Sequence, residues 1–142
     1  MPGRGYGMYV RGNILGSTLW DVRGPVNAGN VSAVSIPVSY TSTGQIANDG
    51  WNLVGNPFPA TIDWNAPSGW TKTNMNAAIY IPDNGNLSSK FATWNGVVGT
   101  SGGSQYIAMG QGFWTKANGN GTPSLSANEN VKASGRQTVF LE

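Results

Sequence analysis

The clearest structural signal in the sequence is the stretch Val34-Ser35-Ile36-Pro37-Val38-Ser39-Tyr40. Apolar and polar side chains alternate along it, and a period of two places them on opposite faces of a β-strand. Val34, Ile36, Val38 and Tyr40 are therefore expected to share the buried face. Pro37 lacks the N–H that a ladder hydrogen bond needs, so we expect this strand at the edge of a sheet or with a bulge.

The same alternation recurs along the chain, and no segment has a convincing helical period. Asp83-Asn84-Gly85-Asn86, Asn95-Gly96 and Asn118-Gly119-Asn120-Gly121 are typical turns, because Asn and Gly tolerate positive φ. Short strands between such turns predict one all-β domain over residues 1–142, a β-sandwich or jelly roll with at most one helical turn, between Thr61 and Trp70. The further candidate strands are Tyr6–Arg11, Thr18–Val22, Trp51–Val54, Ala78–Ile81, Phe91–Trp94, Gln105–Met109, Gly112–Lys116, Asn130–Ala133 and Gln137–Leu141.

A short internal repeat links the two ends of the chain. Gly3-Arg4-Gly5-Tyr6 matches Gly110-Gln111-Gly112-Phe113, and each segment opens an apolar strand. Glycine lets the backbone bend sharply before the strand, and the aromatic residue is then predicted to point inward. On this basis residues 1–12 are expected to form a closing strand related to residues 110–117.

The composition is typical of an extracellular β-module. Charged residues make up only 10 % of the chain, against roughly 25 % in ordinary globular domains, and Asn, Ser, Thr and Gly supply the polar surface. The formal net charge is +2 and the basic residues are scattered, so we expect no nucleic-acid partner. No stretch of about 18 apolar residues is present, so we expect no membrane insertion.

Little catalytic chemistry is open to this chain. It contains no Cys and no His, which excludes Ser-His-Asp and Cys-His arrangements and the usual zinc sites. Glycoside hydrolysis would need two facing carboxylates, and the best pair is Asp63 and Asp83. We instead expect Asp63 to cap a helical turn and Asp83 to shape a hairpin loop, so the chain is predicted to be non-catalytic. A structural calcium ion on Asp83, Asn84 and Asn86 is the one cofactor considered.

The aromatic residues are the most informative side chains, with six Trp and five Tyr in 142 residues. A Trp or Tyr ring can stack on the C–H face of a sugar while amide side chains bind its hydroxyl groups. Trp51 alternates with Leu53 and is assigned to the core, whereas one of Phe113 and Trp114 must face outward. The alternative is that the Trp rings plug the ends of a sandwich, with their N–H groups on loop carbonyls. The candidate carbohydrate-binding residues are Trp94 and Asn95 first, and then Trp64, Trp70 and Trp114.

One series of motifs resembles a known family. The series is Gly50-Trp51-Asn52-Leu53-Val54-Gly55-Asn56-Pro57-Phe58-Pro59, Ile62-Asp63-Trp64, Ala78-Ile79-Tyr80-Ile81, Phe91-Ala92-Thr93-Trp94-Asn95-Gly96 and Tyr106-Ile107-Ala108-Met109-Gly110-Gln111-Gly112-Phe113-Trp114. It resembles a β-rich module of large secreted proteins of the Bacteroidetes, found near type IX secretion sorting domains, over roughly Gly50 to Ala133. The resemblance implies a secreted or cell-surface location and other domains in a larger parent chain. It implies no particular activity, because the family has no common catalytic residues.

Two functions therefore stand open. The first is a carbohydrate-binding module that holds a parent protein against a polysaccharide or surface glycan. The second is a structural or adhesive spacer module of a large surface protein, which the partial repeat and the weakly charged surface also favour. An exposed aromatic platform would favour the first function, and wholly buried tryptophans would favour the second.

Overall fold

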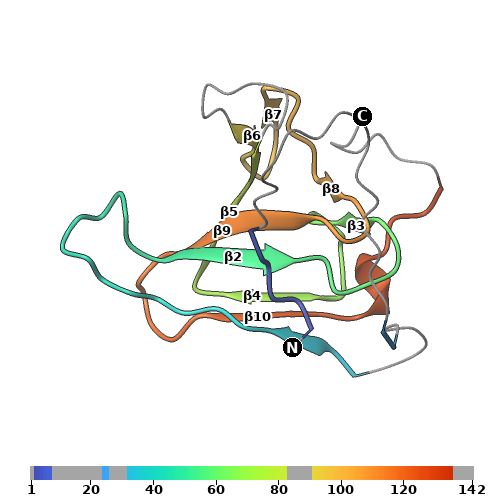
Figure 1. Ribbon diagram of the computed structural model, residues 1–142, viewed down its shortest axis with the longest axis horizontal. Coiled ribbons are helices and arrows are strands. Elements are labelled where there is room, and N and C mark those ends of the chain that lie inside the picture. The colour runs from blue at the N-terminus through green and yellow to red at the C-terminus, as the bar shows by residue number, and fades with distance from the viewer. Residues whose placement is uncertain (1, 8–23, 26–31, 83–90, 136–142) are drawn as a thin grey trace, which may run out of the picture.

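The computed structural model describes residues 2–7, 24–25, 32–82 and 91–135, and these residues form an all-β, sandwich-like fold. The predicted fold class is therefore confirmed. All strand pairing is antiparallel, within three sheets (Figure 1). The elements are β1 (Val34–Ile36), β2 (Trp51–Gly55), β3 (Ile62–Asp63), β4 (Trp70–Thr73), β5 (Met75–Pro82), β6 (Phe91–Trp94), β7 (Gly99–Thr100), β8 (Tyr106–Ile107), β9 (Gly112–Ala117), β10 (Ser124–Ala127) and the 3-10 helix η1 (Glu129–Val131).

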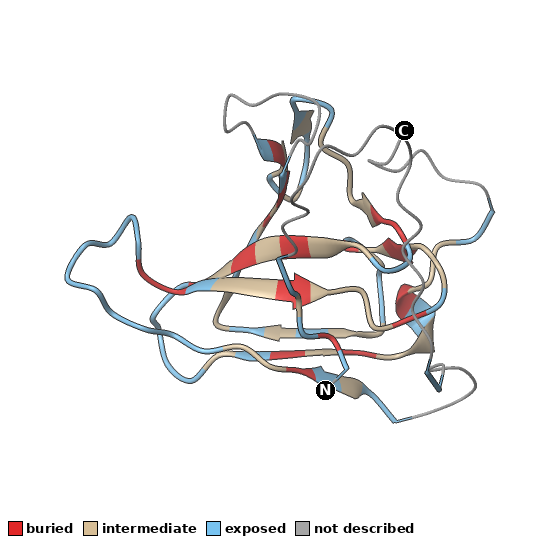
Figure 2. Ribbon diagram, viewed as in Figure 1, coloured by how far each residue is buried: buried red, intermediate tan, exposed pale blue. Residues whose placement is uncertain are grey.

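The largest sheet has five strands in the order β2-β9-β5-β6-β7. Its register pairs Val54 with Phe113 and Ile79 with Thr115, and all four side chains are buried. Buried and partly exposed positions alternate along β9, as Figure 2 shows. One face of this sheet therefore forms the core, and the other face is open to solvent or to a partner.

A three-stranded sheet, in the order β1-β10-β4, supplies the second layer. Ile36 of β1 pairs with Leu125 of β10, and both side chains join the core cluster that includes Val54 and Phe113 of the larger sheet. The pair β3-β8 forms a third, two-stranded sheet, and Ile62 and Ile107 from it are fully buried in the same cluster.

The strand predicted around Pro37 lies at a sheet edge, as expected. β1 is the outer strand of its sheet and ends at Ile36, one residue before the proline. The pairing thus stops where the backbone loses its donor. Tyr40, predicted on the buried face of this strand, lies beyond its end and is exposed.

Two local predictions are wrong. Residues between Thr61 and Trp70 form no helical turn, because β3 occupies Ile62–Asp63 and Asp63 Oδ1 instead accepts a hydrogen bond from Asn65 N at 2.8 Å. The predicted strand Asn130–Ala133 overlaps η1, whose N-cap is formed by Asn128.

The remaining strand predictions divide into three groups. Those at Trp51–Val54, Ala78–Ile81, Phe91–Trp94 and Gly112–Lys116 are confirmed, and Gln105–Met109 is confirmed only as the short β8. The sequence patterns missed β3, β4, β7 and β10. Thr18–Val22, Gln137–Leu141 and most of Tyr6–Arg11 lie outside the described residues.

The N-terminal segment pairs with β2. Arg4 forms an antiparallel bridge with Val54, and Gly55 N donates to Gly3 O at 2.9 Å. β2 therefore lies between this segment and β9, and Gly3 and Gly110 share a positive φ, of 71° and 73°. The two aromatic residues of the repeat differ, however. Phe113 is buried as predicted, whereas Tyr6 is 75 % exposed, which contradicts its predicted inward position.

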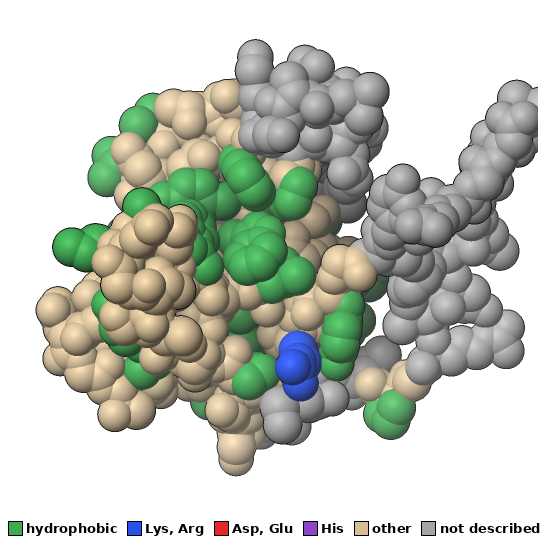
Figure 3. Space-filling model, turned by 60° about the vertical axis from the view of Figure 1, so that its left-hand side comes forward, with side chains coloured by type: hydrophobic (Ala, Val, Ile, Leu, Met, Phe, Trp, Pro, Cys, Tyr) green, Lys and Arg blue, Asp and Glu red, His purple; other side chains and the backbone are tan. Residues whose placement is uncertain are grey.

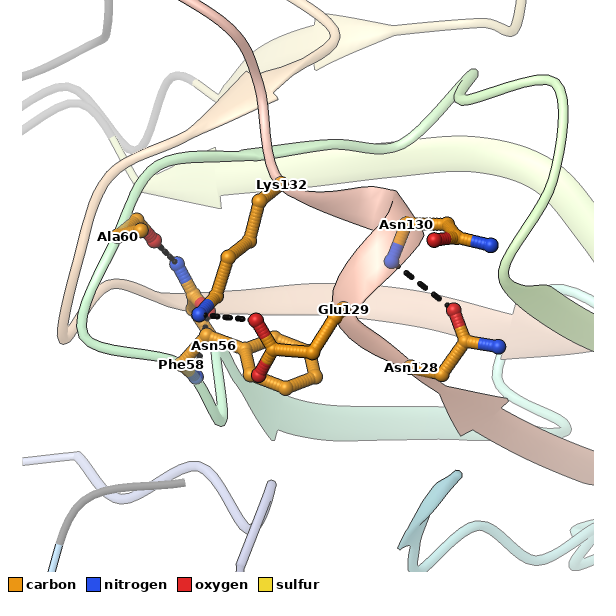
Figure 4. A network of polar contacts seen from close by, with 7 residues as sticks. All are labelled: Asn56, Phe58, Ala60, Asn128, Glu129, Asn130 and Lys132. Carbon is orange, nitrogen blue, oxygen red and sulfur yellow. Dashed lines mark hydrogen bonds and ion pairs between the residues drawn. The ribbon is translucent and has the colours of Figure 1, made fainter. Parts of the chain in front are cut away.

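Asn56 ties the end of β2 to the rest of the sandwich. Its Nδ2 donates to the carbonyl oxygens of Ala60, Ile107 and Ala108, at 2.8, 3.2 and 2.9 Å, and its Oδ1 accepts from Phe58 N at 2.9 Å. Figure 4 shows this side chain near the ion pair of Lys132 with Glu129 at the start of η1. The Gly55-Asn56-Pro57-Phe58-Pro59 motif thus has a structural role at this corner.

Candidate functional site

Four aromatic side chains lie on the outer face of the five-stranded sheet. The register pairs Leu53 with Trp114, Trp114 with Tyr80, and Pro82 with Phe91, so the side chains in each pair share one face. Trp51 lies two residues before Leu53 and therefore belongs to the same face. We call the side chains of Trp51, Tyr80, Phe91 and Trp114 the aromatic face.

The aromatic face is accessible. Trp51 is 39 % exposed and Phe91 is 45 % exposed, while Tyr80 and Trp114 are partly exposed. Figure 3 shows hydrophobic side chains gathered at the centre of one side of the molecule, and no acidic side chain of the described residues is in view there. Exposed apolar side chains that are gathered together, and not scattered singly, often mark an interaction site.

The rings contact one another edge to face. The centroids of Trp51 and Tyr80 are 5.0 Å apart at an interplanar angle of 68°, and those of Tyr80 and Phe91 are 6.5 Å apart at 89°. Such T-shaped pairs are favourable because the positive ring edge meets the negative ring face. These contacts hold the rings of Trp51, Tyr80 and Phe91 in a defined arrangement without a ligand.

Trp51 and Lys116 are both anchored to the loop that precedes β2. Trp51 Nε1 donates to Ala47 O at 2.9 Å, and Lys116 Nζ donates to Ile46 O at 2.7 Å and to Ala47 O at 3.2 Å. Lys116 Nζ also lies 5.4 Å from the Trp51 ring centroid, within the range of a cation–π contact. The orientation of the Trp51 ring is therefore set by the loop as well as by Tyr80.

Asp49 holds that loop closed at its base. Its Oδ1 accepts from Thr43 N at 2.6 Å and from Thr43 Oγ1 at 2.7 Å, and its Oδ2 accepts from the Tyr40 hydroxyl at 3.4 Å. These hydrogen bonds, those of Thr43 above all, lower the pKa of the Asp49 carboxyl, and the nearby Lys116 charge adds to the effect. We call residues 40–49 the Asp49 loop; its tip presents Ile46, which is 85 % exposed.

Trp64, a candidate binding residue from the sequence, has no exposed surface and cannot contact a ligand. Its ring packs edge-on against Trp70 and Phe113, with centroid distances of 4.9 and 5.6 Å, and its Nε1 donates to Ala77 O at 2.7 Å. The β3–β8 pair and both larger sheets surround it. Trp64 therefore has a structural role, but its N–H group bonds to a carbonyl of strand β5 and not to the loop carbonyl that the alternative predicted.

Trp70 and Trp94 also face the interior. Trp70 pairs with the buried Ala127, and Trp94 pairs with the buried Ile79, so both rings lie on the core side of their sheets and pack against the core. Trp70 Nε1 donates to Asp63 O at 2.8 Å, and Trp94 Nε1 donates to Asn65 Oδ1 at 3.3 Å. These polar groups already have protein partners, so we leave both residues out of the site.

Asn95 forms the predicted hairpin turn between β6 and β7. Its Oδ1 accepts from Val97 N at 2.9 Å and from Val98 N at 2.8 Å, and Gly96 adopts a φ of 102°. The side-chain oxygen thus shapes the turn. Of the five predicted binding residues, only Trp114 lies on the aromatic face.

The side chain of Lys72 also reaches into the interior. Lys72 points between the sheets from β4, where its Nζ donates to Trp64 O at 2.8 Å and lies 4.4 Å from the Trp64 ring centroid. Burial lowers the pKa of Lys72, and the charge of Asp63 partly offsets that effect. Gln105 Nε2 donates to Asp63 Oδ2 at 3.2 Å, so the carboxylate is part of a structural network.

The sequence patterns missed Trp51, Tyr80 and Phe91. Trp51 was assigned to the core because it alternates with Leu53, but the buried residue of β2 is Val54 on the opposite face. Asn52, on the core side, hid this pattern: its side chain bonds to Ser39 O and Gly50 O at 2.8 and 2.9 Å. A polar residue can thus lie on the core side of a strand when the backbone satisfies its hydrogen bonds. In that case the sequence pattern assigns the wrong face to the core.

No grouping of three or more Asp and Glu residues suited to a metal occurs in the described ranges. The predicted calcium ligands Asp83, Asn84 and Asn86 lie outside them. In the same part of the chain, no helix has the length and apolarity needed to cross a membrane.

No family model matches this chain, and comparison with curated proteins and with solved structures found no similar protein. The fold and the aromatic face are therefore the basis for any functional assignment.

Proposed function

We propose that this chain is a non-catalytic carbohydrate-binding module whose binding surface is the aromatic face. The observation that carries the proposal is the pair of exposed rings, Trp51 and Phe91, held beside Tyr80 on the open side of an antiparallel sheet. Sugars present C–H groups on their ring faces and hydroxyl groups on their rims. Aromatic rings with an apolar face and a fixed orientation suit such ligands, because little side-chain entropy is lost on binding.

The acidic residues support a non-catalytic function. Among the described residues, the acids are Asp49, Asp63 and Glu129. Asp49 closes its loop, Asp63 bonds to Gln105 and Asn65, and Glu129 pairs with Lys132. Each carboxylate is thus engaged with protein groups and lies off the aromatic face.

The proposed setting is a secreted or cell-surface protein in which this module accompanies other domains. Its support is the resemblance of the Gly50–Trp114 motifs to modules of the Bacteroidetes and the low content of charged residues. The module would hold its parent chain against a polysaccharide, with weak affinity at each site.

A spacer function is the second candidate. The N-terminal segment favours it, because Gly3 and Gly5 form backbone hydrogen bonds at the outer edge of β2. An edge that accepts an additional strand is one way for modules to join end to end. In this case a neighbouring module, and not a glycan, would be the partner of this chain.

Affinity electrophoresis distinguishes the two functions. The purified chain is run through native gels that contain plant, algal or microbial polysaccharides. We expect retardation by at least one polymer and loss of that retardation in Trp51→Ala. The matched control is Val97→Ala at the exposed β6–β7 turn, which should migrate like the unmodified chain. A folded protein that no polymer retards would favour the spacer function.

A further inference from the structure

We infer that the aromatic face binds a single uncharged polysaccharide chain, and not an acidic glycan or the flat surface of a crystalline polymer. This inference rests on the proposed function and specifies its ligand. It depends on the angles between the rings and on the charges around them.

The ring angles show that Tyr80 does not lie in one plane with Trp51 or with Phe91. A crystalline polysaccharide surface is planar, so rings that bind it must lie in one plane. The Tyr80 ring is inclined at 68° to Trp51 and at 89° to Phe91. If Trp51 or Phe91 lies flat against a surface, Tyr80 presents its edge to that surface. A single polysaccharide chain can adapt to a surface that is not planar, because its sugar rings rotate about the linkages between them.

The charge distribution favours a neutral ligand. The one charged side chain that the register of the described strands places on this face is Lys116, paired with Trp51. Its ammonium group already donates to Ile46 O and Ala47 O, and it lowers the pKa of the nearby Asp49 carboxyl. An acidic polysaccharide carries charges along its whole length, and this one lysine, held by two carbonyl oxygens, could pair with at most one of them. The other charges would lie unpaired against the aromatic face, which is costly.

The Asp49 loop gives this arrangement its rigidity. Trp51 Nε1 and Lys116 Nζ both bond to carbonyl oxygens of the loop, and Asp49 closes the loop behind them. Trp51 is therefore held at one end of the aromatic face and Phe91 at the other, with Tyr80 in contact with both. A chain that follows the face would contact the exposed rings at both ends.

The test compares three ligand classes on one protein. Soluble neutral polymers (hydroxyethylcellulose, xyloglucan, galactomannan) and acidic polymers (polygalacturonate, alginate) are titrated by calorimetry, and crystalline cellulose and chitin are used in sedimentation assays. We expect binding to at least one neutral soluble polymer. Trp51→Ala and Phe91→Ala should each weaken it by about tenfold or more, whereas Val97→Ala should not. Because no ion pair forms, affinity in about 0.5 M NaCl should match that at low salt.

The outcomes separate this inference from the function on which it rests. Binding that is confined to acidic polymers, or that falls steeply with salt, would overturn the neutral ligand while leaving a carbohydrate-binding module. Binding confined to the crystalline polymers would overturn the single-chain ligand in the same way. Absence of binding to every class, with the fold intact by circular dichroism, would remove the proposed function and this inference together.

Discussion

At the scale of single residues, the five tryptophans that the structure describes fall into two groups with different tasks. Trp64, Trp70 and Trp94 face the interior, and their indole N–H groups donate to protein oxygens. Trp51 and Trp114 face outward from neighbouring strands. The same residue type thus stabilises the sandwich at one place and forms the candidate binding surface at another, and its position in the sheet register decides which.

Trp64→Phe is expected to destabilise the protein. The smaller ring leaves a gap in the core, and Ala77 O loses the indole donor at 2.7 Å. Loss of the hydrogen bond costs about 0.5–1.5 kcal/mol, and the gap left in the core adds to this loss. Urea unfolding followed by circular dichroism measures the change in the free energy of unfolding. The control is Trp114→Phe on the open face, and equal losses in the two variants would contradict the assignment of Trp64 to the interior.

Asn56→Ala should also cost stability, because one side chain makes four hydrogen bonds to the backbone. At about 1 kcal/mol for each bond, the expected loss is about 2–4 kcal/mol. Thermal or urea unfolding provides the measurement. Asn120→Ala, in the exposed turn after β9, is the matched control and should change stability by about 0.5 kcal/mol or less. Equal stability of the two variants would show that the hydrogen bonds of Asn56 do not stabilise the connection between the end of β2 and β8.

At the scale of elements, the Asp49 loop links the protonation of the Asp49 carboxylate to the position of Trp51, because the loop holds both side chains. The hydrogen bonds to Asp49 favour its charged form, so its pKa in the folded protein lies below the ordinary value of 3.8. A depressed carboxyl pKa contributes stability that is fully present above the unfolded pKa and is lost as the pH falls through the folded one. Acid should therefore loosen the loop that holds Trp51.

Asp49→Asn is expected to remove this pH dependence. At neutral pH the variant should be less stable than the unmodified chain, and the difference should shrink as the pH falls below about 4. Urea unfolding midpoints measured between pH 7 and pH 3 follow this change, and Trp fluorescence reports the environment of Trp51. Parallel pH profiles for the two proteins would show that Asp49 does not stabilise the fold through its charge.

The sequence predicted individual elements where one face of a strand is plainly apolar. β9 is such a case, since Phe113 is buried and Trp114 faces outward, as the alternation required. β4 shows why other elements were missed. Its inward residues are Trp70 and Lys72. The inward lysine is tolerated because its Nζ donates a hydrogen bond to Trp64 O and lies near the rings of Trp64 and Trp70. These contacts form across a turn and between strands, so they leave no alternation of apolar and polar residues in β4 itself.

At the scale of the whole molecule, composition and turn residues were sufficient to predict the all-β class. They did not predict which face of the larger sheet is open, because the outer face of β2 carries the larger apolar residues, Trp51 and Leu53, while its core face carries Asn52 and Val54. The aromatic face gathers residues from four strands that are brought together only by the order β2-β9-β5-β6. Of that face, the sequence predicted Trp114 and missed the other three rings.

The most direct test of the central claim is glycan binding by the double variant Trp51→Ala/Trp114→Ala. Both side chains lie on the outer face of the sheet, so the variant should keep the fold. Affinity gels with the polymer that most strongly retards the unmodified chain provide the measurement, and circular dichroism confirms folding. We predict that the double variant migrates as if no polymer were present. Undiminished retardation of the folded variant would contradict the assignment of the aromatic face as the binding surface.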